Sequence, residues 1–292
     1  EVANMIIEKI DRILNDNIFE GINIHYFGGE PLLNIPVLIY LDENIKKITA
    51  KIGIVYKAFL TTNGSMLSKE LLQKVKFSSI QLTFDGLEKT HDRLRVSDHF
   101  HFKEEIELIE NIMNFSQAKV LLRTNICKEN KDEIIALHKY IFEKFGNERI
   151  EINPNRTIKY HQDDSFEMLS VQEYAEVAYQ IKLLWSEQKG KFELPVPRST
   201  PCKFPYGNAY AISPEGYCTF CSGSMDQEKK YFFDVDIENK KMFSVRKECK
   251  KCNILPLCLG GCIIQYNLRA GACTYEKYEL KNILISYIKH IS

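Results

Sequence analysis

The first half of the chain alternates between two hydrophobic periods. Apolar residues recur every three or four positions in several stretches, which predicts amphipathic helices near residues 3–15, 36–51, 68–76, 103–115 and 131–145. Short apolar runs rich in β-branched and aromatic residues predict strands at residues 22–27, 56–61, 80–84, 120–125 and 150–152. Helices that alternate with strands in this way indicate crossover connections and a parallel α/β sheet.

Polar or glycine-bearing turns follow several of the predicted strands. They are Gly28-Gly29-Glu30-Pro31, Thr62-Asn63-Gly64 and Asp85-Gly86. Ligands of parallel α/β folds bind at the carboxyl ends of the strands, so these turns are the first candidates for a binding site. Paired glycines let the backbone approach a ligand closely, although a Gly-Gly pair after a strand also occurs as an ordinary turn.

The second half has a different organisation. A helix predicted at residues 171–187 precedes a proline-rich link at 194–198. From Cys202 onward the sequence is rich in glycine, cysteine and aromatic residues, until a closing helix predicted near 275–290. We therefore place a domain boundary near residue 195 and expect two domains, at residues 1–194 and 195–292.

Composition and charge exclude several classes of partner. Lys and Arg total 39 and match the 39 Asp and Glu residues, so the net charge gives no electrostatic argument for nucleic acid or an anionic membrane. No apolar run approaches the ~18 residues of a membrane span. The sequence opens on an amphipathic helix without an initiator Met, which is no signal peptide. We expect a cytoplasmic protein, with a strand and its loop ahead of the first helix.

Cysteine usage is the strongest compositional signal. The chain has nine cysteines, of which only Cys127 lies outside the stretch from Cys202 to Cys273. We interpret Cys127, just past a predicted strand, as a small buried or partly exposed filler. Disulfides suit short secreted chains better than one end of a large domain, so the dense region favours metal ligation.

Zinc and iron–sulfur clusters are the two metal hypotheses. The tight Cys249-x2-Cys252 pair can direct two thiolates to one metal centre. A four-thiolate zinc site is one interpretation, with ligands Cys249, Cys252, Cys258 and Cys262. That site leaves Cys202, Cys221 and Cys273 unexplained, whereas eight cysteines suffice for two [4Fe–4S] clusters.

The spacing of the whole array is specific. It runs Cys202-x13-Gly216-x4-Cys221, then Cys249-x2-Cys252-x5-Cys258-x3-Cys262, then Cys273. In spacing, order and the interposed glycine it resembles the signature of SPASM domains, the auxiliary-cluster domains of many radical S-adenosylmethionine (SAM) enzymes. The resemblance implies an outer cluster held by Cys249, Cys252, Cys258 and Cys273. It implies an inner cluster held by Cys202, Cys221 and Cys262, with Cys218 as either a fourth ligand or an ordinary free thiol.

The strand ends of the first half carry a matching resemblance. The stretch from His25 to Pro31 is similar to the GGEP turn of radical SAM barrels, which hydrogen-bonds the methionyl ammonium of SAM. The stretch from Gln81 to Gly86 with His91-Asp92-Arg93 resembles a later strand end of the same enzymes, although His91 also fits a surface helix start. The SAM-binding residues that the resemblance implies are Gly28, Gly29, Glu30, Pro31, Asn63, Thr83, Asp85, Arg123 and Asn125. Among them, Arg123 suits a carboxylate because its guanidinium binds bidentately.

The family resemblance implies a partial (β/α)6 TIM-like barrel of parallel strands that lacks its first strand here, followed by a small Cys-rich SPASM domain. One feature departs from the family. The Cys-x3-Cys-x2-Cys loop that holds the SAM-cleaving cluster is absent from this sequence. Either the chain is truncated, or it is a degenerate relative without radical chemistry. The preserved SAM-facing turns favour truncation.

The function implied by the resemblance is a radical SAM peptide or protein maturase. A 5′-deoxyadenosyl radical would abstract hydrogen from a ribosomally made peptide, and auxiliary [4Fe–4S] clusters would aid oxidation or ligate a substrate thiolate. The expected cofactors are SAM, two auxiliary clusters and a SAM-binding cluster upstream, with flavodoxin or ferredoxin as electron donor. The alternatives are a sulfatase-maturing, formylglycine-forming enzyme, a non-catalytic relative, or a zinc-binding interaction protein. No catalytic residue is assigned.

Overall fold

The computed structural model describes most of the chain in two compact units. The described residues are 1–16, 18–146, 148–159, 166–200, 202, 209–219, 230–234, 245–262 and 273–291. The first unit is formed mainly by residues 7–157 and the second mainly by residues 158–292. The second unit thus begins upstream of the proline-rich link, and the domain assignment made from the sequence stays a prediction.

The first unit is built on a parallel sheet of five strands in the order β1-β2-β3-β4-β5. Every pair of neighbouring strands is parallel, so the predicted α/β fold class is confirmed. The strands are β1 (Gly21–Tyr26), β2 (Val55–Thr61), β3 (Phe77–Thr83), β4 (Lys119–Ile126) and β5 (Ile150–Arg156). Each corresponds to one strand expected from the hydrophobic pattern.

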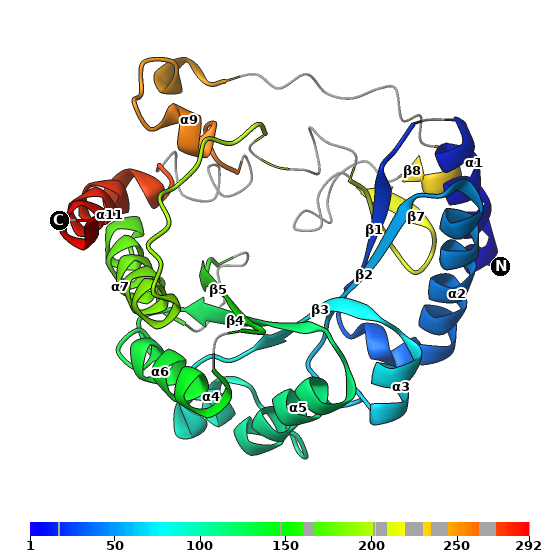
Figure 1. The fold of residues 1–292 in the computed structure, drawn as a ribbon, viewed down its shortest axis with the longest axis horizontal. Coiled ribbons are helices and arrows are strands. Elements are labelled where there is room, and N and C mark those ends of the chain that lie inside the picture. Colours follow the sequence, from blue (N-terminus) through cyan, green and yellow to red (C-terminus); the bar gives the residue numbers. More distant parts are fainter. Residues whose placement is uncertain are drawn as a thin grey trace. The chain divides into compact units, whose positions relative to one another are not determined.

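Helices α2 to α6 of this unit lie on one side of the sheet (Figure 1). The helices are α1 (Val2–Asp16), α2 (Ile35–Ile52), α3 (Lys69–Lys74), α4 (Glu88–Leu94), α5 (Phe102–Phe115) and α6 (Ile134–Phe145), with a 3-10 turn η1 (Pro31–Asn34) before α2. Helix α2 begins where the Asn34 side chain accepts a hydrogen bond from the Val37 N–H, and it ends at Gly53 in the left-handed region. Helix α4 was suggested only by the helix start that fits His91, because its seven residues are too few to show a helical period.

The two faces of the sheet differ in polarity. Residues with alternating spacing on the helix side, such as Ile80, Leu82 and Leu122, are fully buried, which provides the hydrophobic core. The opposite face carries polar side chains that bond across strands. On it, Nε2 of His25 lies 2.8 Å from Oγ1 of Thr61. This face therefore offers hydrogen-bonding groups beside the carboxyl ends of the strands.

The second unit joins helices to a small sheet. Its elements are α7 (Val171–Lys189), α9 (Leu255–Cys258), α11 (Glu276–Ile291), the 3-10 turns η2 (Phe232–Asp234) and η3 (Lys247–Cys249), and the strands β6 (Ala211–Ile212), β7 (Tyr217–Thr219) and β8 (Lys230–Tyr231). The three strands form an antiparallel sheet. Helices α7 and α11 pack together through the Lys182–Glu279 ion pair, and Tyr174 of α7 makes an edge contact with Tyr275, the residue before α11.

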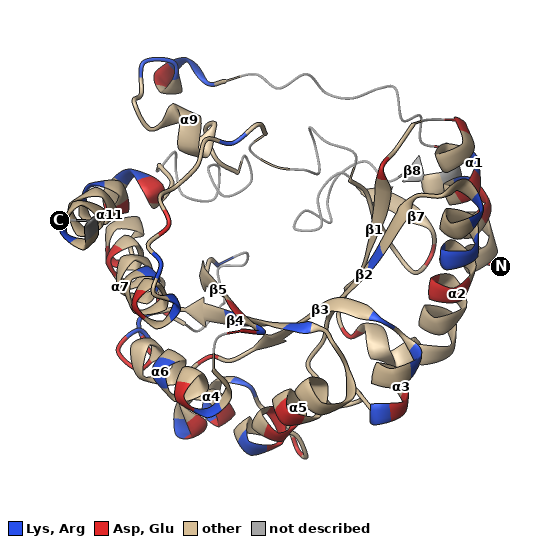
Figure 2. Cartoon of the chain, in the orientation of Figure 1, with Lys and Arg blue, Asp and Glu red and all other residues tan. Residues whose placement is uncertain are grey.

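Charge is spread over the helices in both signs. Figure 2 shows acidic and basic residues mixed along α5 and α6, in keeping with the equal totals of the sequence. Within the described ranges, no helix has the length and apolar character that crossing a membrane requires.

Candidate functional site

Glu30 ties the turn after β1 to the turn after β2. One carboxylate oxygen accepts hydrogen bonds from the Leu32 N–H at 3.0 Å and from the Thr62 hydroxyl at 2.7 Å. The other oxygen accepts a hydrogen bond from the backbone N–H of Asn63 at 2.7 Å. These are charge-assisted bonds, which are stronger than bonds between neutral groups. The carboxylate therefore holds two of the predicted ligand-binding turns in one fixed arrangement.

The glycines of the first turn border open space. Gly28 has a φ of +149°, and a Cβ added at Gly28 or at Gly29 would meet no heavy atom within 4 Å. By contrast, a Cβ on Gly64 in the second turn would lie 2.6 Å from Leu108. The backbone of Gly28 and Gly29 is thus exposed to an approaching group, as a cradle for a small-molecule ligand requires.

Asp85 and Asn125 join the ends of β3 and β4. The Asp85 carboxylate accepts a hydrogen bond from the Asn125 N–H at 3.0 Å, and its other oxygen lies 3.4 Å from Nη1 of Arg95. Burial raises the pKa of Asp85, against the opposing effects of Arg95 and of the Asn125 amide. The Arg123 guanidinium donates to Oδ1 of Asn125 at 2.9 Å, and Thr83 is the register partner of Arg123. Four predicted residues therefore form one group at this edge.

Asn130 is a residue that the sequence analysis missed. Its side-chain amide donates to the carbonyl oxygens of Asp85 and Asn125, each at 2.8 Å, and its oxygen accepts the Cys127 N–H at 2.9 Å. One buried side chain thus satisfies three backbone groups of two strand ends. The signal in the sequence is an asparagine four residues past the end of β4, a place where such side chains bond to nearby backbone. Cys127 itself is buried, as we expect of a filler.

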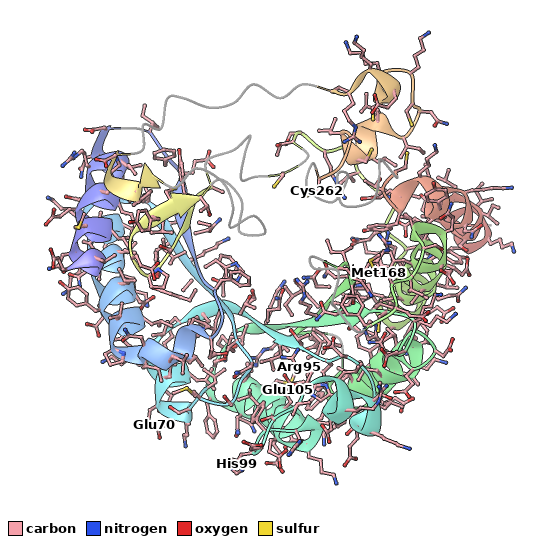
Figure 3. The ribbon with its side chains drawn as sticks, turned by 180° about the vertical axis from the view of Figure 1, so that it is seen from behind. Glu70, Arg95, His99, Glu105, Met168 and Cys262 are labelled. Atoms are coloured by element: carbon pink, nitrogen blue, oxygen red, sulfur yellow. The ribbon has the colours of Figure 1, made fainter. Side chains whose placement is uncertain are left out.

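His91 lies in a helix, α4, as the helix-start interpretation expects, but it is not on the surface, so the solvated part of that interpretation is wrong. It is 3% exposed, and its Nδ1 accepts the backbone N–H of Asp85 at 3.4 Å. Its Nε2 lies 3.2 Å from Oε2 of Glu105. The sequence analysis did not single out Glu105, which occupies an inward position of the amphipathic helix α5. Figure 3 shows Glu105 near Arg95, whereas the exposed residues Glu70 and His99 lie at the outer side of the helices.

The structure gives the position of individual cysteines in the second unit, but not a ligand cluster among the described residues. Cys218 is buried on β7, and burial raises the pKa of its thiol to about 11. Cys221 lies outside the described residues. The described part of the chain brings together no group of three or more side chains positioned to hold a metal ion. The ligand sets implied by the family resemblance therefore stay predictions.

Hydrogen-bond donors point at three sulfurs of the predicted outer cluster. The Gly260 N–H donates to Cys258 Sγ at 3.4 Å, Nη2 of Arg246 to Cys249 Sγ at 3.7 Å, and Nζ of Lys277 to Cys273 Sγ at 3.8 Å. Nearby cations and N–H groups stabilise thiolates, which are the metal-binding form of cysteine. This donor set fits an anionic thiolate cluster.

The turn after Cys258 has an unusual backbone. Leu259, Gly260 and Gly261 have successive φ values of 47°, 86° and 69°. Leu259 is the one residue other than glycine with positive φ in the described chain, and such a conformation is strained for a branched side chain. A Cβ on Gly260 would lie 4.0 Å from Cys249 Sγ, so this turn runs close beside a predicted ligand.

Comparisons with known proteins address the fold. No protein-family model matches the chain, and no curated protein matches it. The structure is similar to anSMEcpe with bound AdoMet, at 15% identity and a TM-score of 0.72, over 99% of this chain and 90% of that chain. It is also similar to anSMEcpe with bound AdoMet and Kp18Cys peptide, at 17% identity and a TM-score of 0.71, over 98% of this chain and 88% of that chain.

A third similar structure is that of Streptococcus suis SuiB bound to S-adenosylmethionine. It shares 17% identity and a TM-score of 0.57, over 89% of this chain and 66% of that chain. Identities this low establish a common fold and nothing finer. The expected fold is thereby confirmed: this chain has the α/β fold of the AdoMet-bound structures of anSMEcpe and SuiB.

Proposed function

We propose that the protein is a radical SAM enzyme that modifies a peptide or protein substrate. The observation that carries this proposal is the open glycine turn of Gly28 and Gly29, which Glu30 fixes to the end of β2. It lies at the carboxyl edge of a parallel sheet, where ligands of such folds bind. Similar folds with AdoMet bound support the choice of ligand.

Different residues at this edge suit different chemical groups of SAM. The exposed backbone of Gly28 and Gly29 suits the ammonium group of the ligand, and the Arg123 guanidinium suits its carboxylate. Thr83 and Asn125 supply neutral polar groups for ribose hydroxyls. SAM held by these residues beside an iron–sulfur cluster would supply the organic radical that this class of reaction needs to remove hydrogen from a substrate carbon.

The polar face of the sheet supports a peptide substrate. The side-chain amide of Asn153 donates to Gln81 at 3.1 Å, and that of Asn155 donates to the Asn153 carbonyl at 2.8 Å. Amide side chains of this kind can both donate to and accept from a peptide backbone. A similar fold solved with Kp18Cys peptide supports the same substrate class.

The cysteines of the second unit would hold auxiliary [4Fe–4S] clusters in this proposal. The donors that point at Cys249, Cys258 and Cys273 support thiolate ligands, and the spacing of the array supports two clusters rather than one zinc ion. Their role would be to accept an electron from the substrate or to bind a substrate thiolate.

The test begins with anaerobic reconstitution of the full-length protein, followed by counts of iron, acid-labile sulfide and zinc. SAM binding and release of 5′-deoxyadenosine are then measured with a chemical reductant. We expect roughly eight irons with matching sulfide from the two auxiliary clusters, in addition to about four from the cluster that acts with SAM, together with SAM binding and turnover. Zinc without sulfide, and no affinity for SAM, would favour a structural or binding module instead.

A further inference from the structure

A buried acid lies behind the candidate SAM site. Glu105 on α5 is 1% exposed, and its carboxyl group contacts the backbone of Thr83 and the ring of His91. Its one ion-pair contact in that part of the chain is with His91, whose Nε2 lies 3.2 Å from Oε2. Burying a carboxyl group costs free energy that an apolar residue in a helix would avoid. The acid therefore indicates a role beyond packing.

His91 is held in one orientation between Glu105 and Asp85. Its ring centroid lies 5.4 Å from that of Phe84 and 5.7 Å from that of Phe102. Because Nδ1 accepts the Asp85 N–H, a neutral ring carries its proton on Nε2, the nitrogen that faces Glu105. The contacts thus run in a chain from Glu105 through His91 to the backbone of Asp85.

We propose that Glu105, acting through His91, is a positioning residue for the SAM site. The pair fixes the backbone of Asp85, and the Asp85 carboxylate in turn joins the ends of β3 and β4. This role rests on the proposed function, because it concerns the same ligand. Both side chains are buried behind the strand ends, so they act on the ligand indirectly, through Thr83, Asp85 and Asn125.

The charge on Glu105 and His91 depends on pH. Burial lowers the pKa of His91 to about 4 and raises the pKa of Glu105 to about 8, so both groups are uncharged near pH 7. The charged and titratable groups around them are Asp85, Asp92, Arg95 and His101. Ionisation of Glu105 above pH 8 adds a negative charge that competes with Asp85 for Arg95. We therefore expect the strand-end arrangement to weaken in alkaline solution.

The first experiment measures SAM affinity at pH 7 and pH 9 on the reconstituted full-length protein and on the Glu105→Gln variant. The unaltered protein should lose about tenfold more affinity than the variant, because the fraction with protonated Glu105 falls from about nine tenths to about one tenth. Titration of the ligand's own amino group is common to both proteins. Glu107→Gln, an exposed neighbour on α5, serves as the control and should follow the unaltered protein.

A second variant separates positioning from folding. His91→Phe keeps the aromatic packing with Phe84 and Phe102 but removes the acceptor for the Asp85 N–H. We expect faster hydrogen exchange at the Asp85 amide and weaker SAM binding at pH 7, with unchanged iron content. If both the unaltered protein and Glu105→Gln bind SAM and their SAM affinities change equally with pH, the positioning role is overturned. The proposed function would stand in that case. Absence of SAM binding by the unaltered protein would overturn the proposed function and this role with it.

Discussion

The backbone N–H of Asn125 donates to Oδ1 of Asp85 at 3.0 Å and so joins the ends of two neighbouring strands. The other Asp85 oxygen faces the Arg95 guanidinium at 3.4 Å. Both carboxylate oxygens thus contact the protein's own groups, which makes Asp85 part of the scaffold of the site. In this arrangement Arg123, which extends from the same edge, is the side chain best suited to a ligand carboxylate.

Arg123→Ala should weaken SAM binding by about 10- to 100-fold, since a hydrogen bond to a charged group contributes roughly 1.5–3 kcal/mol. Iron content should not change, because Arg123 lies apart in sequence from every predicted cysteine ligand. Calorimetry on the full-length protein measures the affinity. Arg93→Ala is the matched control, because Arg93 is exposed and pairs with Glu129. Equal SAM affinity in Arg123→Ala and the unaltered protein would contradict the assigned role.

Glu30→Gln should lower both stability and SAM affinity. The amide that replaces one carboxylate oxygen places a donor opposite either the Asn63 N–H or the donors of Leu32 and Thr62. We expect the free energy of unfolding to fall by about 1–3 kcal/mol, measured by urea denaturation. Thr62→Val removes a single donor and should have a smaller effect. Glu43→Gln, at an exposed pair with Lys74, should leave both quantities unchanged; a similar loss there would argue against a specific role of Glu30.

Cys252→Ala or Cys258→Ala should remove one auxiliary cluster, that is, about four irons with their sulfide. The second unit should also become less stable, because metal binding contributes folding free energy. Iron and sulfide counts with thermal denaturation are the measurements. Cys127→Ala is the control: Cys127 is buried in the first unit and should keep the full count. Full iron in the Cys252 and Cys258 variants would exclude the predicted outer cluster.

His138 should make the first unit sensitive to acid. It is fully buried, its Nε2 lies 3.1 Å from Oγ1 of Thr124, and its Nδ1 has no partner among the described residues. Burial lowers its pKa to about 4, whereas the pKa of histidine in the unfolded chain is about 6.5. Between these two pH values His138 is protonated in the unfolded chain but not in the folded protein. This contribution to stability is therefore present above pH 6.5 and is lost as the pH falls, by about 2 kcal/mol at pH 5.

Urea denaturation at pH 7.5 and pH 5 tests the role of His138. His138→Gln keeps a partner for Thr124 and should lose about 2 kcal/mol less than the unaltered protein over this interval. His99→Asn, at an exposed histidine, should behave like the unaltered protein. The same loss in His138→Gln and the unaltered protein would show that other groups cause the acid sensitivity.

The strands and most helices of the first unit could be predicted because their hydrophobic periods are long and distinct. Buried runs such as the one around Leu122 cannot face water, so the pattern alone indicates a parallel sheet. Helix α4 could not be predicted in the same way. Its His91 is polar in the sequence but buried by Phe84 and Phe102 from other elements, and such packing is a tertiary effect.

The candidate site was predicted in its outline but not in its internal bonding. The strand-end positions of Glu30, Asp85 and Arg123 follow from the order of elements. The sequence did not reveal that Glu30 bonds to the next turn, or that Asn130 and Glu105 support Asp85. The first two contacts join residues 33 and 45 positions apart, and the third depends on helix packing, so neither spacing nor propensity identifies them.

The bonds of Glu30 to two successive turns have a mechanical consequence. A displacement of Gly28 and Gly29 shifts the neighbouring Glu30 carboxylate. It therefore also shifts Thr62 and Asn63, which donate hydrogen bonds to that carboxylate. Binding at one loop would thus be energetically coupled to the conformation of the other, and by linkage the effect is reciprocal. A substitution that stiffens or loosens the second loop would change occupancy at the first, even when it touches no ligand.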